Sequence, residues 1–158
     1  MKIALAGDHA GFALKQHLAA FLRAAGHDVI DLGVETDAVP SDYPDIAERV
    51  AEAILDGRAE RGILACGSGV GVSIAANKIP GIYAAVIHDV YSAHQGVEHD
   101  RMNVICVGAR VIGTATAEEI IRAFISAQPS SEERHERRFA KLQAIEARKS
   151  DSADSTGE

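Results

Sequence analysis

Five short apolar segments, separated by stretches with helical periodicity, constrain the fold of this chain more than any other feature. Strands that are apolar along their whole length are typical of a parallel sheet covered on both faces, because a half-exposed strand alternates polar and apolar residues. Alternation of such strands with helices predicts an α/β/α sandwich around a parallel sheet. The predicted strands are Lys2–Ala6, Asp28–Leu32, Gly62–Cys66, Ile82–Ile87 and Asn103–Val107.

Amphipathic helices are predicted between these strands. In the first, apolar residues recur at helical spacing from Leu14 to Ala25, Lys15 is assigned to the polar side, and Gly26 ends the helix. Weaker versions of the same pattern predict further helices at Pro44–Leu55, Val72–Asn77, Tyr91–His99 and Ala115–Ala127.

A polar segment at residues 132–149 predicts a final helix. Its few apolar positions suit either a helix lying across its own domain or one packing on a partner subunit. The last residues, 150–158, are small, polar and charged, so we expect a disordered tail after a single domain of residues 1–149. The apolar positions of the helix are Phe139, Leu142 and Ile145.

Composition excludes several classes of protein. A formal net charge of -7 argues against nucleic-acid binding through a general positive field. No apolar run approaches the ~18 residues of a membrane span, and no secretory leader follows Met1, so we expect a cytoplasmic protein without membrane or nucleic-acid partners. Cys66 and Cys106 lack CxxC spacing, so we expect reduced thiols and neither a disulfide scaffold nor a metal site.

Polar residues follow the predicted strands at one edge of the sheet. Ligands of open parallel sheets bind beyond the carboxyl ends of the strands, so these residues are expected to converge on one site. The residues are Asp8 and His9 after the first strand, Cys66 and Ser68 at the end of the third, His88 after the fourth and Arg110 after the fifth.

The loop after the third strand is the most informative of these. Its glycines let successive backbone N–H groups point into one concavity ahead of a helix, which is an arrangement that binds anions. Val72 stands where the dinucleotide fingerprint needs a glycine and where a Cys-x5-Arg pattern needs arginine, and GxxxxGK[ST] is absent, so cofactor binding and phosphoryl chemistry lose support. A tight turn without a ligand is the alternative. The loop residues are Gly67, Ser68, Gly69, Val70 and Gly71.

The two thiols differ in their surroundings. A thiol at the end of a buried strand is either inert packing or a reactive group. Cys66 precedes the glycine-rich loop, whose N–H groups favour a thiolate and a neighbouring oxyanion, and this context favours a base or a nucleophile. Cys106 lies inside an apolar strand, and we assign it to packing.

The histidines are sorted by their position relative to the polar edge. His99 lies at the end of a helix that enters the fifth strand, where an imidazole can transfer protons near neutrality, and His9 and His88 directly follow strands. The other histidines are His17 and His27, assigned to the surface, and His94 and His135, assigned to solvated or supporting positions.

Two arginines of the last helix, Arg134 and Arg138, are four residues apart and share a helical face. Solvated charge is the usual explanation of such a pair. Two forked guanidinium donors also suit a phosphate group, and they would complete a neighbour's site if the helix crosses to a second subunit.

Together these motifs resemble the ribose-5-phosphate isomerase B family, which includes allose- and galactose-6-phosphate isomerases, over about residues 1–149. The resemblance implies a Rossmann-like sheet of five parallel strands, a C-terminal interface helix, and a homodimer, or a tetramer, with active sites shared between subunits. It implies no metal or nucleotide cofactor. The motifs are Gly7–Phe12, Asp42–Pro44, Cys66–Gly71, Ile74–Lys78, Tyr91–Ala93 and Asn103–Arg110.

The resemblance also implies aldose–ketose isomerisation of a sugar phosphate, with ribose 5-phosphate to ribulose 5-phosphate as the first expectation. Cys66 matches the base that moves a proton between C1 and C2 through an enediolate, and His99 matches the group that helps to open the sugar ring. Ser68 and the amides of Gly67–Gly71 match the hole that holds the enediolate, and Asp8 matches a ligand of sugar hydroxyls. The phosphate-side positions are matched by His9, Arg110, Arg134 and Arg138, the last two reaching across the dimer.

Asp100 departs from the family pattern, because pentose-phosphate members usually carry Asn after the residue that matches His99. An ionised carboxylate lacks the donor capacity of an amide, so Asp100 is expected to read a different hydroxyl. An allose, galactose or tetrulose phosphate therefore stays open as the substrate. A non-catalytic phosphosugar or nucleotide sensor is the hypothesis of another class, and thiol redox chemistry at Cys66 is a third.

Overall fold

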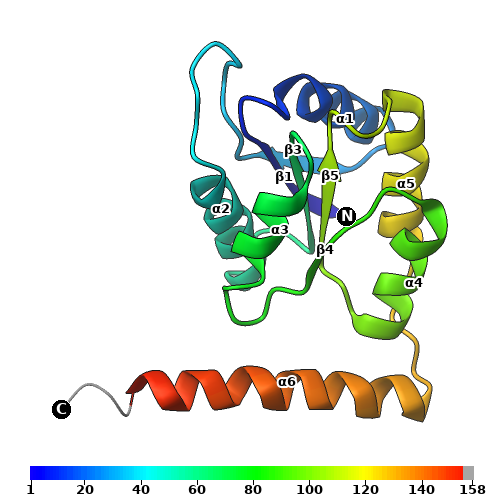
Figure 1. The fold of residues 1–158 in the computed structure, drawn as a ribbon. Helices are drawn as coiled ribbons and strands as arrows, with labels where there is room; N and C mark the ends of the chain where they lie inside the picture. The colour runs from blue at the N-terminus through cyan, green and yellow to red at the C-terminus, as the bar shows by residue number, and fades with distance from the viewer. Residues whose placement is uncertain (155–158) are drawn as a thin grey trace.

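The computed structural model describes the backbone of residues 1–154 and the side chains of residues 1–148. Its strands form one parallel sheet in the order β2-β1-β3-β5-β4 (Figure 1). This confirms the predicted α/β architecture with a five-stranded parallel sheet. The strands are β1 (Lys2–Gly7), β2 (Asp28–Asp31), β3 (Arg61–Cys66), β4 (Ala84–Val86) and β5 (Val104–Gly108).

Helices cover both faces of the sheet. One face is covered by α1, α4 and α5, and the opposite face by α2 and α3. Among residues 1–154, no helix combines the length and apolar character needed to cross a membrane. The helices are α1 (Phe12–Ala24), α2 (Tyr43–Leu55), α3 (Val70–Ala76), α4 (Val90–Asp100), α5 (Thr114–Ser126) and α6 (Glu133–Asp154).

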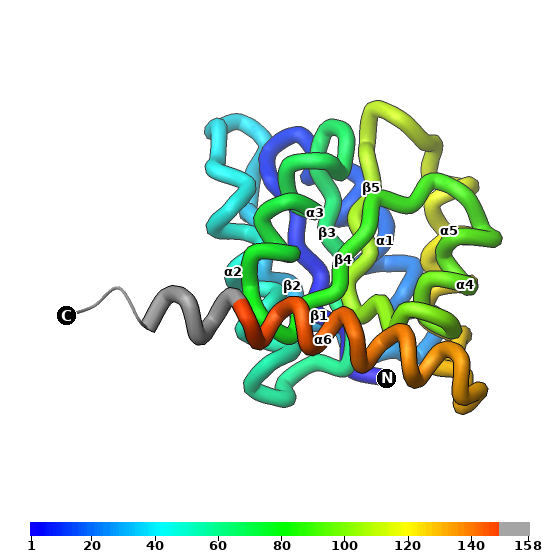
Figure 2. The backbone as a smooth tube through the Cα atoms, turned by 60° about the horizontal axis from the view of Figure 1, so that its bottom comes forward, coloured from blue at the N-terminus to red at the C-terminus, as the bar shows by residue number. Residues whose placement is uncertain are grey.

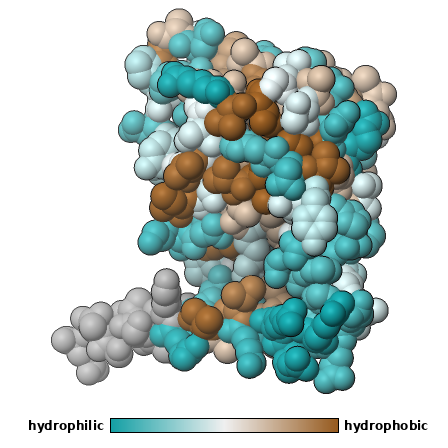
Figure 3. Space-filling model, turned by 45° about the vertical axis from the view of Figure 1, so that its right-hand side comes forward, coloured by the Kyte–Doolittle hydropathy of each residue, from teal (hydrophilic) through white to brown (hydrophobic). Residues whose placement is uncertain are grey.

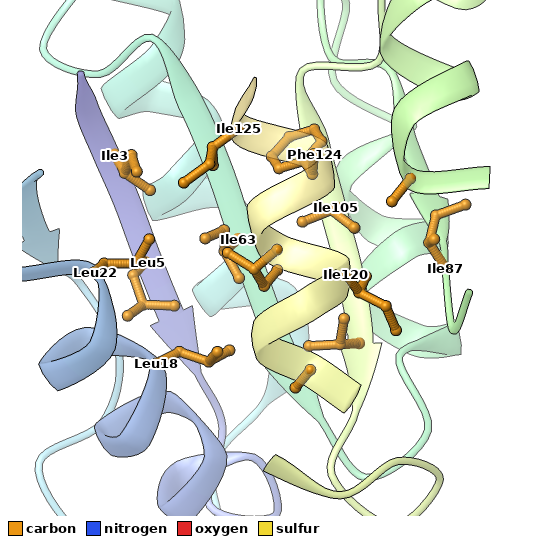
Figure 4. Packing of buried hydrophobic residues seen from close by; sticks show 14 of the residues in the cluster. Ile3, Leu5, Leu18, Leu22, Ile63, Ile87, Ile105, Ile120, Phe124 and Ile125 are labelled. Atoms are coloured by element: carbon orange, nitrogen blue, oxygen red, sulfur yellow. The ribbon is translucent and has the colours of Figure 1, made fainter. Parts of the chain in front are cut away.

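The core is divided between the two faces because successive residues of a strand point in opposite directions. In β3, Ile63 packs beneath α1 and α5, whereas Leu64 and Cys66 pack beneath α2 and α3. Figure 4 shows the first of these layers, in which Leu18 of α1 and Phe124 of α5 lie over the strands. Burial on both faces fixes β3, and so fixes the start of the loop that follows Cys66 at the carboxyl edge of the sheet.

Every element except α6 lies within two residues of its predicted bounds, and α6 runs to Asp154, five residues beyond its predicted end at residue 149. The differences at α3 and β4 have identifiable causes. Helix α3 begins at Val70, two residues before the predicted start, because Gly69 adopts a left-handed conformation (φ 83°) and turns the chain into the helix. Strand β4 is shorter than predicted. The backbone N–H of Tyr83 donates to the side chain of Asn103 at 2.8 Å, which takes the place of a strand partner.

Lys15 is a buried residue, and its assignment to the polar side of the first helix is wrong. It is 2% exposed, and its Nζ donates to both carboxylate oxygens of Asp31 (2.9 and 3.0 Å) and to the carbonyl of Val34 (2.9 Å). Positions 15, 18, 19 and 22 lie on one helical face, so the lysine stem enters the core face and its charge is satisfied at the end of β2.

Helix α6 lies across the amino ends of the strands (Figures 1 and 2). Phe139 packs edge-on against Tyr83 with ring centroids 5.0 Å apart, and Glu146 accepts hydrogen bonds from the N–H of Gly81 (2.9 Å) and the hydroxyl of Tyr83 (3.1 Å). The helix therefore packs on its own domain. The predicted disordered tail, 150–158, overlaps the end of α6 and otherwise lies outside the described residues.

Candidate active site

The loops after β1, β3 and β5 meet at the carboxyl edge of the sheet. The carbonyl of Cys66 accepts the N–H of Ala109 at 2.8 Å, and the carbonyl of Gly67 accepts the N–H of Arg110 at 3.0 Å. These hydrogen bonds join the loop after β3 to the loop after β5. The structure thus brings together nine of the predicted site residues, which are Asp8, His9, Cys66, Gly67, Ser68, Gly69, Val70, Gly71 and Arg110.

Cys66 ends β3 with its thiol beneath the glycine-rich loop. The side chain is 5% exposed, and Sγ accepts the N–H of Gly69 at 3.0 Å. A backbone donor at this distance stabilises a thiolate, because a hydrogen bond to an ionised acceptor is stronger than one to a neutral acceptor. The next turn is held by the hydroxyl of Ser68, which accepts the N–H of Val70 at 3.3 Å.

Asp8 is held close to this loop by the packing of β1 on β3. Its carboxylate is largely buried, and it accepts the N–H of Gly11 at 2.9 Å. A Cβ on Gly11 would lie 2.1 Å from the carbonyl oxygen of Ala65, so only glycine permits this approach of the first loop to the end of β3. The position of Asp8 therefore depends on Gly11.

His9 is oriented by the loop that connects β2 to α2. The N–H of Ser41 donates to Nδ1 of His9 at 3.2 Å, and the N–H of His9 donates to the Ser41 hydroxyl at 3.1 Å. Because Nδ1 is the acceptor, the neutral ring carries its proton on Nε2, which leaves that nitrogen as a donor towards a ligand.

Tyr43 is a residue of this edge to which the sequence analysis gives no role. A Cβ on Gly71 would lie 3.0 to 3.2 Å from ring atoms of Tyr43, so the aromatic ring covers the start of α3. Its place in the motif Asp42–Pro44 is a sequence signal, but the contact with Gly71 depends on how α2 packs against α3.

Positive charge at this edge comes from Arg110. Its side chain is exposed and lies along the loop, since a Cβ on Gly67 would be 3.7 Å from its Nη1. The neighbouring His88 accepts the N–H of Gly108 on Nε2 at 2.9 Å and so supports the end of β5. Arg110 is therefore the cation best placed for an anionic ligand at this loop.

Cys106 lies in the apolar core beside β3, which confirms its assignment to packing. Burial, together with the nearby sulfur of Cys66, raises the pKa of the Cys106 thiol well above its ordinary value. Within the described residues, no three His, Cys, Asp or Glu side chains are grouped so as to hold a metal ion.

The remaining four predicted site residues lie at the opposite edge of the sheet: His99, Asp100, Arg134 and Arg138. His99 is in the last turn of α4, where its ring stacks on His135 of α6 with centroids 4.0 Å apart. Strand β3 alone spans about 16 Å, so within one chain these groups and Cys66 lie at opposite edges of the sheet. The solvated alternative for His135 is wrong, since it is 3% exposed.

The side chains at this amino edge are exposed or paired locally. Asp100 is exposed, and so is Arg138. The Nε of Arg134 donates to Glu132 at 2.8 Å and to Nε2 of His135 at 3.1 Å. These positions keep the arginines available at the molecular surface and away from the carboxyl-edge loops of the same chain.

The sequence matches known proteins along most of its length. A family model described as Ribose/Galactose Isomerase matches residues 3–142. Ribose-5-phosphate isomerase B of Escherichia coli is 43% identical over 148 residues, which cover 94% of this chain and 98% of that protein. D-erythrulose-4-phosphate isomerase of Pectobacterium atrosepticum is 42% identical over 128 residues, covering 81% of this chain and 84% of the relative.

Solved structures share the fold. Ribose-5-phosphate isomerase B of Clostridium thermocellum superposes with a TM-score of 0.90 at 42% identity, covering 94% of this chain and 99% of that one. The enzyme of Mycoplasma genitalium with bound ribulose-5-phosphate gives a TM-score of 0.86 at 35% identity, covering 92% and 96%.

The fold, the carboxyl-edge site and these likenesses define a sugar-phosphate aldose–ketose isomerase. The chain belongs to the Ribose/Galactose Isomerase family.

Proposed function

We propose that this chain interconverts D-ribose 5-phosphate and D-ribulose 5-phosphate, with Cys66 as the base. The observation that carries the proposal is the contact between Sγ of Cys66 and the N–H of Gly69, which puts the sulfur beside the backbone donors of the glycine-rich loop. The likeness to ribose-5-phosphate isomerase B over nearly the whole chain supports the choice of a pentose phosphate.

The proton transfer follows from this geometry. In the direction from aldose to ketose, the thiolate of Cys66 removes the proton on C2, and the C1 carbonyl oxygen becomes an enediolate oxygen. The thiol then returns the proton to C1. A proton also passes from O2 to O1, next to the hydroxyl of Ser68. Negative charge that develops on the oxygens faces the N–H groups of Gly67–Gly71, and preorganised donors of this kind lower such barriers most effectively.

Binding and ring opening need groups from the opposite edge. We assign phosphate binding to His9, Arg110, Arg134 and Arg138, and ring opening to His99. His99 donates the Nε2 proton to the ring oxygen as the C1–O4 bond breaks, and the proton of the O1 hydroxyl returns to that nitrogen through water, so the imidazole ends neutral as the C1 carbonyl forms. Since β3 separates Cys66 from His99 in one chain, a second copy must supply the other half of each site.

The surface of the chain suits such a homodimer. Exposed apolar side chains lie on the sheet domain, and Figure 3 shows apolar areas above α6, whose own visible surface is mainly hydrophilic. A groove of about 460 Å³ runs between β4, α4 and α6 and includes Tyr83, Asp100 and Leu142 in its walls. Strand β4 is an edge of the sheet, so this side offers the second copy unpaired backbone and apolar contacts.

The experiment is isomerisation of ribose 5-phosphate in deuterated water, followed by NMR. We expect turnover with deuterium exchange at the transferred position, loss of both in Cys66→Ala, and full activity in the matched variant Cys106→Ala. Active Cys66→Ala protein would contradict the assigned base. Tight sugar-phosphate binding without turnover or exchange would support the sensor hypothesis, and thiol oxidation coupled to substrate would support redox chemistry.

A tetrulose phosphate is the second candidate substrate. It is favoured by the 42% identity to a D-erythrulose-4-phosphate isomerase and by the carboxylate of Asp100 at the position that reads a sugar hydroxyl. The ratio kcat/KM for four-, five- and six-carbon sugar phosphates decides between the candidates. A higher ratio for the four-carbon sugar, reversed in Asp100→Asn, would replace ribose 5-phosphate as the substrate.

A further inference from the structure

His135 is a buried imidazole beside the residue to which we assign ring opening. Its ring is 3% exposed and stacks on His99 with an interplanar angle of 20° and centroids 4.0 Å apart. The two residues come from different elements, α4 and α6, so the stack is also a contact between those helices. It fixes the plane of the His99 ring relative to the amino edge of the sheet.

The hydrogen bonds of the two rings define which nitrogens carry protons. Nε2 of His135 accepts from Nε of Arg134 at 3.1 Å, and its Nδ1 is enclosed without a partner among the described residues. Nδ1 of His99 lies 2.8 Å from the amide nitrogen of Gln95 and accepts from it, so the neutral ring carries its proton on Nε2. That proton is the one ring opening requires.

We infer that His135 is a positioning residue, whose flat ring, together with Gln95, holds His99 with its Nε2–H directed towards the substrate of the neighbouring subunit. The inference rests on the proposed function, because it concerns how the ring-opening group is presented. A fixed orientation of the His99 ring favours ring opening, because general acid catalysis requires the proton to lie within hydrogen-bond reach of the leaving oxygen.

The surroundings of His135 disfavour the charged form of its imidazole. Burial is the main factor that lowers its pKa, and His99, Arg134 and Arg138 lower it further, whereas Glu132 opposes them. Arg101 from the end of α4 is paired with Glu136, so this neighbouring charge is locally compensated.

The two directions of the reaction separate this role from simple support of the fold. Ribose 5-phosphate closes to a furanose and must be opened, whereas ribulose 5-phosphate stays open because its O5 carries the phosphate. Exchange of the C1 proton of ribulose 5-phosphate with deuterated water therefore reports proton transfer at Cys66 without ring opening. Conversion of ribose 5-phosphate reports both steps.

The test compares His135→Ala, His135→Phe and the control Glu146→Ala, which removes the hydrogen bonds of α6 with Gly81 and Tyr83 without touching His99. We expect His135→Ala to lower conversion of ribose 5-phosphate by about tenfold to a hundredfold while exchange into ribulose 5-phosphate changes less than about twofold. His135→Phe, which restores a flat ring, should recover most of the loss. Glu146→Ala should change neither rate.

An equal loss in both assays, or no loss in either, would overturn the positioning role. Gln95→Leu provides the same comparison if His135→Ala does not fold, because it removes the other contact of His99 and leaves α6 in place. An equal loss in both assays for that variant, or no loss in either, would also overturn the positioning role. Failure of the proposed function is distinguishable, since the wild-type protein would then not exchange the C1 proton of ribulose 5-phosphate.

Discussion

Cys66 and Cys106 lie on the same face of the sheet but in different chemical surroundings. Cys66 is at the carboxyl edge and accepts a backbone N–H, whereas Cys106 is enclosed in the core and its thiol pKa is raised by burial. We therefore expect iodoacetamide at neutral pH to alkylate Cys66 at least about ten times faster than Cys106. Peptide mass spectrometry of timed samples measures this, and comparable labelling of both thiols would contradict it.

Gly11 is a second residue with a sharply defined consequence. A Cβ there would meet the carbonyl oxygen of Ala65 at 2.1 Å, so Gly11→Ala must displace the Asp8 loop from the end of β3. We expect a loss of about 2 to 3 kcal/mol in the free energy of unfolding, measured by urea denaturation, together with a loss of isomerase activity. Gly113→Ala is the matched control, because a Cβ at Gly113 meets no atom within 4 Å.

At the scale of single elements, the docking of α6 buries His135 in surroundings that disfavour its charged form. The folded state disfavours the imidazolium, so the unfolded chain binds more protons and stability rises with pH. This contribution to the free energy of unfolding is fully present above the ordinary histidine pKa of about 6.5 and is lost as pH falls below that value through the lowered pKa of the folded state. We expect the free energy of unfolding to fall between pH 8 and pH 5.5 more steeply in the wild type than in His135→Phe. Equal slopes of the free energy of unfolding against pH in the two proteins would contradict a contribution from His135.

The position of α6 is also where sequence reasoning reaches its limit. Periodicity predicts the helix, but its few apolar residues are compatible with either a partner or its own domain, and only the structure shows the contacts of Phe139 and Glu146 with its own domain. The strands and the carboxyl-edge loops were predictable because apolar runs and glycine spacing are local signals. The stack of His99 on His135 was not, since it joins two elements across the fold.

Two further residues show the same distinction between local and tertiary signals. Lys15 lies at the spacing of the core face, yet a charged side chain is expected to face solvent. Only the structure shows that Asp31 pairs with its charge. Tyr43 belongs to a recognisable motif, but its contact with Gly71 comes from the packing of two helices. Sequence therefore places Cys66 at the end of a strand beside the glycine-rich loop, whereas the supporting contacts emerge only in the structure.

At the scale of the whole molecule, a site assembled from two chains predicts complementation. Cys66→Ala and His99→Ala are each expected to be nearly inactive alone. In a mixed dimer of the two variants, one site carries both substitutions and the other carries neither. Random exchange of subunits should therefore restore about a quarter of the wild-type specific activity with ribose 5-phosphate.

The control for complementation is a mixture of Cys66→Ala with Ser68→Ala. Both substitutions lie on the same loop, so every site of the mixed dimer remains defective and no activity should return. Native mass spectrometry measures how far the subunits have exchanged. Complete exchange of the first pair without recovery would place Cys66 and His99 in the same chain's site and contradict the shared arrangement.

The opposite placement of Cys66 and His99 has a consequence for how activity depends on protein concentration. A buried five-stranded sheet is a rigid spacer, so no hinge or loop movement can close the distance within one chain. With the proposed two-chain site, we expect catalytic competence to arise only on encounter between two molecules. Specific activity should fall on dilution below the dissociation constant of the pair, even though each separated chain keeps its reactive thiol and its fold.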